Sequence, residues 1–212
     1  MKRLLILPTL LAGLLLCGCT REVSPVSALA LDKQDGSYRL TAEVVRQDSL
    51  DDVAAPSYLS VTGGDMPELV QKLRGVLSGD LYLSHAQVLL LSEEVAGESI
   101  LPLTDYLCKN NDVRLSLRVA VVRGGAADAL LQNDDEVYAL SELLDQAAEA
   151  GTLPNTPLYR ACETLHADGT TILPALRLDE FEQTAPAGTA VFSSAQLTCF
   201  LDSSEIGGGA DA

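Results

Sequence analysis

The stretch "HAQVLLLS", residues 85–92, decides the fold. It is a continuous run of valine and leucine between polar residues, which is the pattern of a strand covered on both faces. A strand with one solvated face would alternate apolar and polar residues. We therefore expect a strand here with both faces buried.

The residues that follow predict a crossover to a second strand. A helix is expected from Ser99 through Asn110, with Pro102 tolerated near its start. In "LSLRVAVVRGG", residues 115–125, the alternating positions of a strand share one apolar face: Leu115, Leu117, Val119 and Val121. Strand, helix and strand in this order predict an α+β fold, a mixed β-sheet with packed helices.

On the N-terminal side, alternating residues around an Asp-Gly turn predict a β-hairpin over residues 28–44. Asp32 and Asp35 resemble a calcium loop only faintly, and turn chemistry explains them better. After a loop containing Pro56, "SYLSVTGG" at residues 57–64 predicts another strand.

A capping-box-like start at Asp65 and Glu68 then predicts a helix, with Pro67 in its first turn and Gly79 as its stop. Its apolar positions form one stripe that faces the core: Met66, Leu69, Val70, Leu73, Val76 and Leu77.

The polar break at residues 133–136 is the predicted boundary between two α/β subdomains, residues 19–134 and 135–202. Two helices are expected after it, one from Val137 to Gly151 and one opened by Thr156-Pro157 that closes near Gly169. The inward residues of the second are Leu158, Ala161, Cys162 and Leu165.

The last part of the chain predicts β structure. "TTILPALRLDE", residues 170–180, reads as a strand that Pro174 breaks or confines to an edge. A final hairpin joins residues 189–193 to 196–202, and residues 203–212 form a flexible tail.

The N-terminus has the layout of a secretory signal, residues 1–18. Lys2 and Arg3 precede an apolar stretch that is too short for a stable membrane span. The end of that stretch, Leu16-Cys17-Gly18-Cys19, resembles the bacterial lipobox. The resemblance implies cleavage between Gly18 and Cys19 and attachment of diacylglycerol to the Cys19 thiol, so that Cys17 leaves with the signal. A plain secreted protein or a Cys-x-Cys metal pair is the alternative.

Loss of the signal would leave 12 basic against 30 acidic side chains, a formal charge of −18. Such a field repels nucleic acid and anionic lipid headgroups, so no nucleic-acid partner is expected and the lipid must supply any membrane attachment. The 47% hydrophobic content indicates a folded protein.

Three cysteines remain after Cys19, namely Cys108, Cys162 and Cys199. An odd number cannot all pair within the chain, and three do not make a disulfide framework. Cys162 and Cys199 fall on predicted apolar faces, where a thiol behaves as a small hydrophobe. We expect core packing for them rather than a reactive role.

The sequence contains no G-x-S-x-G, H-E-x-x-H, P-loop or G-x-G-x-x-G pattern of the kind that marks catalytic sites. Of the two histidines, His85 is expected to be a hydrogen-bonded residue at a strand start, and His166 lies 81 positions further on. The acidic groups at 93–94 and 134–136 could pair as acid and base, but such runs are more often solvated loop or helix-cap charges. The predictions are no enzyme activity, no catalytic residues, no metal site and no cofactor.

Several segments together resemble a known family. They are the lipobox cysteine followed by Arg21-Glu22-Val23, the hairpin "ALALDK…GSYRLTAEVV", and, in order, "LSGDLYLSHAQVLLLSEEVA", "PLYRACETLHADGTTILPALRL" and "GTAVFSSAQLTCFL". From about residue 19 to residue 202 they are similar to the Ger(x)C family, the C-subunit lipoproteins of spore nutrient germinant receptors. Members of that family are longer, so the chain resembles their N-terminal module.

The resemblance implies a non-enzymatic, palmitate-bearing lipoprotein that functions in spore germination. It would lie on the extracytoplasmic face of the cell membrane, in the spore the inner membrane, held there through Cys19. The implied partners are the integral membrane subunits of the receptor, to which nutrient sensing is mostly assigned in the family.

The competing hypothesis is a solute-binding lipoprotein that feeds an importer. Such proteins usually need two lobes around a cleft, for which 194 mature residues are few. Ligand-induced thermal stabilisation would separate the two hypotheses.

Overall fold

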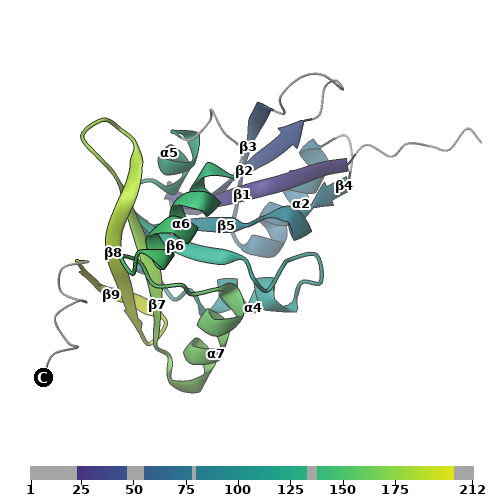
Figure 1. Cartoon of the computed structure of the whole chain (residues 1–212). Helices are drawn as coiled ribbons and strands as arrows, with labels where there is room; N and C mark the ends of the chain where they lie inside the picture. The colour runs from purple at the N-terminus through teal and green to yellow at the C-terminus, as the bar shows by residue number, and fades with distance from the viewer. Residues whose placement is uncertain (1–22, 47–54, 78–79, 133–137, 203–212) are drawn as a thin grey trace, which may run out of the picture.

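A mixed β-sheet organises the molecule. The computed structural model describes residues 23–46, 55–77, 80–132 and 138–202. Within them the strands are β1 (Val23–Gln34), β2 (Ser37–Arg46), β3 (Ala55–Gly63), β4 (Asp80–Tyr82), β5 (Val88–Ser92), β6 (Arg118–Arg123), β7 (Thr171–Leu178), β8 (Thr184–Ser193) and β9 (Gln196–Leu201). They form one nine-stranded sheet in the order β3-β2-β1-β5-β6-β7-β8-β9, with β4 beside the start of β1 (Figure 1).

The centre of the sheet is parallel and its flanks are antiparallel. β1, β5, β6 and β7 run in one direction, with Leu29 opposite Leu89 and Leu89 opposite Val119. β2 and β3 extend the sheet on one side, and β8 and β9 extend it on the other. The predicted α+β fold with a mixed sheet is confirmed.

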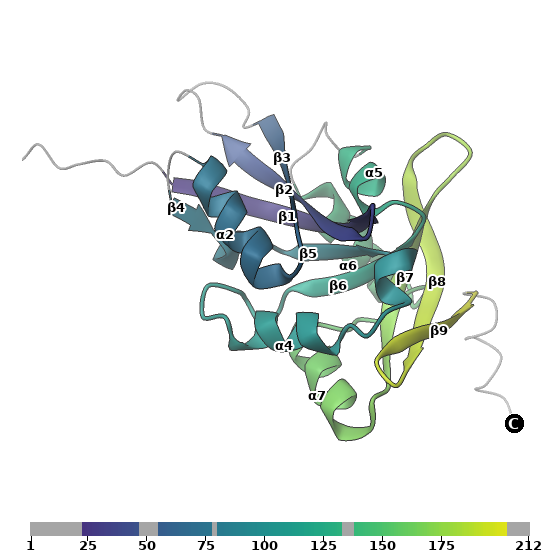
Figure 2. The same cartoon turned by 180° about the vertical axis from the view of Figure 1, so that it is seen from behind.

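Helices cover both faces of the sheet. They are α2 (Met66–Val76), α3 (Glu93–Ala96), α4 (Leu101–Lys109), α5 (Ala126–Leu131), α6 (Ala139–Glu149) and α7 (Leu158–Asp168), with a 3₁₀ turn η1 (Leu83–His85) before β5. The core of one face joins the strands to α2, α4 and α7, and the core of the other joins them to α5 and α6. α5 and α6 lie in front of the sheet in Figure 1, and α2 and α4 lie in front in Figure 2. None of the described helices combines the length and the apolar character needed to cross a bilayer.

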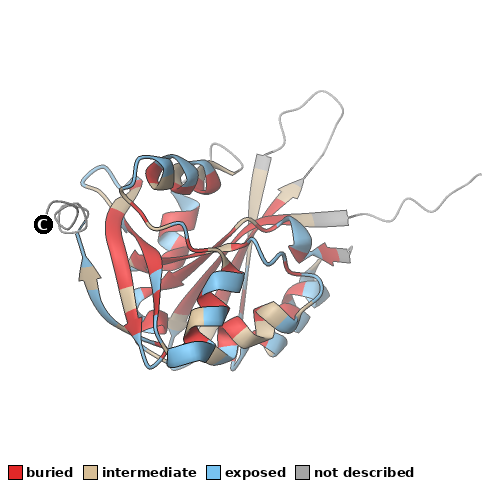
Figure 3. Ribbon diagram, turned by 60° about the horizontal axis from the view of Figure 1, so that its bottom comes forward, coloured by how far each residue is buried: buried red, intermediate tan, exposed pale blue. Residues whose placement is uncertain are grey.

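β5 explains why the sheet has two covered faces. Leu89 and Leu91 point into the core with α2, α4 and α7, whereas Val88 and Leu90 point into the core with α5 and α6. All four are at most 1% exposed, and burial of each such side chain contributes about 2 kcal/mol. Figure 3 shows buried residues along the strands and on the helix sides that face them. The prediction of a strand buried on both faces is confirmed for residues 88–92.

The crossover from β5 to β6 is also confirmed, with α4 between the two parallel strands. Ile100, Leu103 and Leu107 are buried along α4 and its first turn, and the helix ends before Asn110. Leu115 was expected in the second strand, but it lies in the turn before β6 and is 50% exposed. That expectation is wrong because the strand begins only at Arg118.

The helix predicted after Asp65 forms as α2. The Asp65 carboxylate accepts a hydrogen bond from the Glu68 backbone N–H at 2.9 Å, and Glu68 Oε2 accepts one from the Gly64 N–H at 2.7 Å. Val76 does not belong to the buried stripe, because it is 58% exposed at the last turn of the helix. The other predicted helices of the C-terminal half form as α6 and α7, and the four inward residues predicted for α7 are buried.

Both hairpins are confirmed. Asp35 and Gly36 have φ values of 50° and 78°, which the type I′ turn between β1 and β2 requires. Ser194 and Ala195 turn the chain between β8 and β9. Cys199 on β9 is exposed, so the expectation that it packs in the core is wrong: β9 is the last strand of the sheet order. Pro56, which was expected in a loop, lies inside β3.

Pro174 does not place its strand at an edge. β7 lies between β6 and β8, so the edge alternative is wrong for the strand as a whole, although residues 171–174 pair with β8 alone. β6 pairs with β7 only at residues 175–177, and the register with β8 shifts between Pro174 and Leu176. The missing N–H of the proline is therefore accommodated beside an irregularity rather than in a continuous ladder.

The predicted subdomain boundary at residues 133–136 lies outside the described residues. The strands on either side of it pair directly, since Val121 of β6 is opposite Ala175 of β7. The two predicted subdomains therefore share one sheet.

Candidate functional site

The predicted lipid-attachment residue Cys19 and the cleavage residue Gly18 lie outside the described residues. β1 begins at Val23, so the first strand of the sheet starts four positions after Cys19.

The two histidines lie in different elements. His85 is exposed in the turn η1, and no described residue hydrogen-bonds to its ring. The expected hydrogen-bonded histidine at a strand start is therefore wrong, because β5 begins three residues later. His166 is exposed on α7, with its Nε2 2.6 Å from Asp105 Oδ1.

The carboxyl ends of β1, β5 and β6 meet at one edge of the sheet and border a crevice of about 540 Å³. In open sheets with parallel strands, ligands commonly bind in the crevice outside this edge. We call it the β1-β5-β6 crevice. Its lining residues are Asp32, Lys33, Arg39, Ser92, Glu93, Glu94, Gly124 and Gly125.

Asp32 closes the floor of the crevice. Its carboxylate accepts hydrogen bonds from the backbone N–H groups of Ala126, at 2.7 Å, and Ala127, at 2.9 Å. These are the first residues of α5, whose own N-cap residue Gly125 has no side chain to accept them. Asp32 is 5% exposed, and Arg39 Nη2 lies 3.7 Å from it. No local sequence pattern indicates this role, because the helix that Asp32 caps begins 94 positions later.

Lys33 belongs to a polar cluster at the rim. Its Nζ hydrogen-bonds to Glu98 Oε1, and the Tyr38 hydroxyl donates to Glu98 Oε2 at 2.7 Å. The hydrogen bond to Glu98 raises the pKa of Lys33, and the same bond lowers the pKa of Glu98. The ammonium group also lies 5.2 Å from the centre of the Tyr38 ring. Lys33 is therefore held as a fixed cation at neutral pH.

Glu93 and Glu94 form the opposite, acidic rim. They begin α3, and the Ser92 hydroxyl caps this short helix by accepting a hydrogen bond from the Val95 N–H at 3.3 Å. Two carboxylates in the first turn are favourable for the helix dipole. The interpretation of this pair as helix-cap charges is confirmed.

The crevice thus presents fixed charges of both signs, supplied by segments far apart in the sequence. Arg39 contributes a second cation, and its Nε is buried with no hydrogen-bond partner among the described residues. No group of three or more histidine, cysteine or carboxylate side chains in the described part of the chain could hold a metal ion. This arrangement suits contact with a partner that carries complementary charges.

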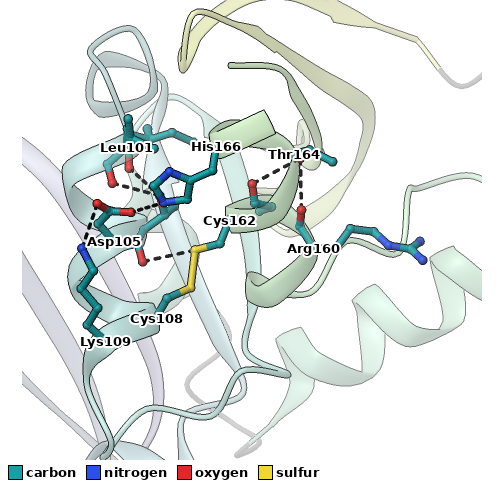
Figure 4. Close-up of a disulfide and its surroundings, with 11 residues drawn as sticks. Leu101, Asp105, Cys108, Lys109, Arg160, Cys162, Thr164 and His166 are labelled. Atoms are coloured by element: carbon teal, nitrogen blue, oxygen red, sulfur yellow. Dashed lines mark hydrogen bonds and ion pairs between the residues drawn. A yellow bond between two sulfur atoms is a disulfide. The ribbon is translucent and has the colours of Figure 1, made fainter. Parts of the chain in front are cut away.

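Cys108 and Cys162 form a disulfide that joins α4 to α7 (Figure 4). The expectation that Cys162 packs in the core is confirmed, but its thiol is not free. The residues are 54 positions apart, and their helices meet only because both cover the same face of the sheet. The number of cysteines was the only sequence feature that could have indicated this bond, since three cysteines after Cys19 allow one disulfide and one free thiol.

A charged cluster lies on the same seam between the two helices (Figure 4). Asp105 of α4 contacts Lys109 Nζ at 3.2 Å and His166 Nε2 at 2.6 Å. Partial desolvation acts to raise the pKa of Asp105, but hydrogen bonds with Lys109 and His166 outweigh it and hold that pKa below its usual value. The cluster reinforces the seam that the disulfide crosslinks.

Comparison with known proteins gives a consistent result. The family model described as the spore germination protein N-terminal domain matches residues 21–178. YfkR of Bacillus subtilis (strain 168), which is named as a spore germination protein, is 24% identical over 193 aligned residues. That alignment covers 75% of this chain and 50% of YfkR, so the chain spans about half the length of the curated relative it matches. No solved structure matches the chain significantly.

The matched range includes the hairpin that carries Asp32 and Lys33 and the segment that carries Glu93 and Glu94. These segments meet in the β1-β5-β6 crevice. The resemblance inferred from the sequence is confirmed, and the chain belongs to the family of spore germination protein N-terminal domains.

Proposed function

We propose that this chain is a non-enzymatic, lipid-anchored subunit of a spore nutrient germinant receptor, and that it acts through protein contacts. The observation that carries the proposal is the family match over three quarters of the chain, which includes the residues of the crevice. YfkR, named as a spore germination protein, supports the same process.

Export to the extracytoplasmic side is supported by the disulfide between Cys108 and Cys162. Disulfides persist in oxidising compartments and are rare in the bacterial cytosol. The lipobox-like sequence before Cys19 supplies a route to the membrane surface.

The position of the crevice suggests how the subunit meets its partners. Lys33 is ten residues after Val23, so at about 3.3 Å per residue the crevice lies about 33 Å from the start of β1. The exposed carboxylates of Glu93 and Glu94 favour a basic surface on the extracytoplasmic part of an integral membrane subunit.

The anchor is tested by a matched pair of substitutions. Cys19→Ala should move the protein from the membrane fraction to the soluble fraction of spores and should abolish the germination response to nutrients. Cys17→Ala should change neither, because this residue is removed with the signal. Retention of Cys19→Ala in the membrane, or an intact nutrient response in a deletion strain, would contradict the proposal.

The contact surface is tested by charge reversal at the crevice. Glu93→Lys with Glu94→Lys should reduce co-purification with the integral membrane subunits after detergent extraction. Glu163→Lys, an exposed change on α7, should leave co-purification intact. Equal recovery of the subunits with both variants would count against the crevice as the contact. Co-purification with importer subunits instead would favour the solute-binding alternative.

A further inference from the structure

A second groove lies where the start of α7 meets the β7-β8 pair, and it shares no lining residue with the β1-β5-β6 crevice. Its volume is about 540 Å³, within the range of small-molecule sites. The groove is lined by Pro154, Asn155, Thr156, Arg160, Thr164, Thr170, Thr171, Ile172, Val191, Phe192 and Ser193. No acidic residue occurs in this lining, although the chain has 30 acidic and 14 basic side chains.

Two hydroxyl groups in the groove lack partners. Thr156 and Thr171 are 4% and 6% exposed, and no described residue hydrogen-bonds to either hydroxyl. The neighbouring Thr164 differs, because its hydroxyl donates to the Arg160 carbonyl at 3.1 Å. Neither hydroxyl oxygen is among the buried atoms of the described residues that lack a partner, so each reaches solvent in the groove and can hydrogen-bond to a molecule there.

Arg160 supplies the positive charge. Figure 4 shows its side chain extending away from α7 and from the disulfide, with bonds drawn only to its backbone. Within the part of the chain that the structure describes, its guanidinium has no ion pair or hydrogen bond. A guanidinium offers a planar pair of donors that matches the two oxygens of a carboxylate.

The groove also has an apolar wall. Ile172 of β7 is 49% exposed, and Val191 lies opposite it on β8. A carboxylate that bonds to Arg160 could place a short branched apolar group against these two side chains.

We infer that this groove binds a small carboxylate with a short apolar branch. Arg160 pairs with the carboxylate, the hydroxyls of Thr156 and Thr171 hydrogen-bond to polar atoms of the ligand, and Ile172 and Val191 contact its apolar part. Arg160 is the charged side chain of the lining, and its cation favours anionic over cationic ligands.

Isoleucine methyl resonances test the inference on the purified full chain. Ile172 and Ile100 are the isoleucines of the described residues, and Ile100, at 1% exposed, is an internal control. Titration with 3-methylbutanoate should shift the Ile172 methyl resonance saturably and leave that of Ile100 in place. The neutral isostere 3-methylbutanamide should bind at least about tenfold more weakly, because it cannot form the charged pair.

Substitutions in the groove test how much its positive charge and its hydroxyl groups each contribute to the affinity for the ligand. Arg160→Gln should lower the affinity for 3-methylbutanoate to that for the amide, whereas Arg114→Gln, an exposed change outside the groove, should leave it unchanged. Thr171→Val should weaken binding with an unaltered melting temperature. No saturable shift of Ile172 up to the solubility limit, or equal affinities for the two probes, would overturn the inference.

Discussion

Glu43 is a carboxylate buried on β2, with 3% of its surface exposed. Burial raises its pKa, while hydrogen bonds from Ser27 and Tyr58 act in the opposite direction without cancelling the rise. The folded protein therefore holds this proton to a higher pH than the unfolded chain does. The stabilisation is complete below the ordinary pKa of 4.5 and is lost as the pH rises through the folded-state pKa.

Glu43→Gln should remove this pH dependence. The free energy of unfolding of the unmodified protein, minus that of the variant, should fall as the pH rises from about 4 to about 8, because Gln does not ionise. Urea denaturation across this range measures the difference. Glu149→Gln, at an exposed position, should give a difference that does not vary with pH, and a flat curve for Glu43→Gln would contradict the assignment.

Asp32 is a structural residue within the candidate site. Asp32→Asn would keep one acceptor oxygen but place an amide donor against the other of the two buried N–H groups, so we expect the free energy of unfolding to fall by about 2 kcal/mol. Asp35→Asn in the exposed turn should change it by less than about 0.5 kcal/mol, since asparagine tolerates the positive φ there. Similar values for the two variants would show that Asp32 does not cap α5.

At the scale of elements, three kinds of interaction hold α4 against α7. They are the disulfide, the Asp105 cluster and the packing of buried side chains such as Leu107 and Leu165. A crosslink over 54 residues restricts the unfolded chain, which by the chain-entropy account stabilises the fold by about 4 kcal/mol.

Replacement of both Cys108 and Cys162 by alanine should lower the free energy of unfolding by about 3 kcal/mol, since crosslinks often contribute less than the entropy estimate. Reduction of the unmodified protein with dithiothreitol should lower the free energy of unfolding by a similar amount. Because reduction breaks the crosslink but keeps both side chains, it distinguishes the contribution of the crosslink from that of side-chain packing. Cys199→Ala, an exposed position, is the control and should have little effect. An unchanged urea midpoint after reduction would argue against a stabilising bond.

At the scale of the whole molecule, β6 and β7 join the two halves of the chain into one sheet across the predicted boundary. The core on the face covered by α2, α4 and α7 contains residues from both halves, such as Leu89 and Phe192. Separation of the halves would expose the facing edges of β6 and β7 and the part of the core that both halves share.

We therefore expect a single cooperative unfolding transition. Native-state hydrogen exchange should give the same opening free energy for the amides of Leu90 on β5 and Ala190 on β8, which lie on opposite sides of residue 134. Two separate values, or a stably folded fragment of residues 19–134, would instead support two subdomains.

The sequence by itself determined the local elements and the family. The unbroken apolar run at residues 88–91 predicted a strand buried on both faces, and the alternation around Asp35-Gly36 predicted a hairpin. The apolar stripe at residues 158–165 likewise predicted α7, and the capping residue Asp65 predicted the start of α2. Each of these features depends on residues within a few positions of one another, where side-chain periodicity and turn chemistry report directly on the backbone.

Only the tertiary structure decided which distant residues meet. Asp32 caps a helix that begins 94 positions later, Cys108 bonds to Cys162 across 54 positions, and Pro174 lies in an interior strand because its neighbour pairs with only part of β7. The β1-β5-β6 crevice likewise exists because three strands that are separate in the chain end at the same edge of the sheet. Such contacts follow from how the faces of the sheet and helices bury one another, and that burial is a property of the whole chain which no local pattern encodes.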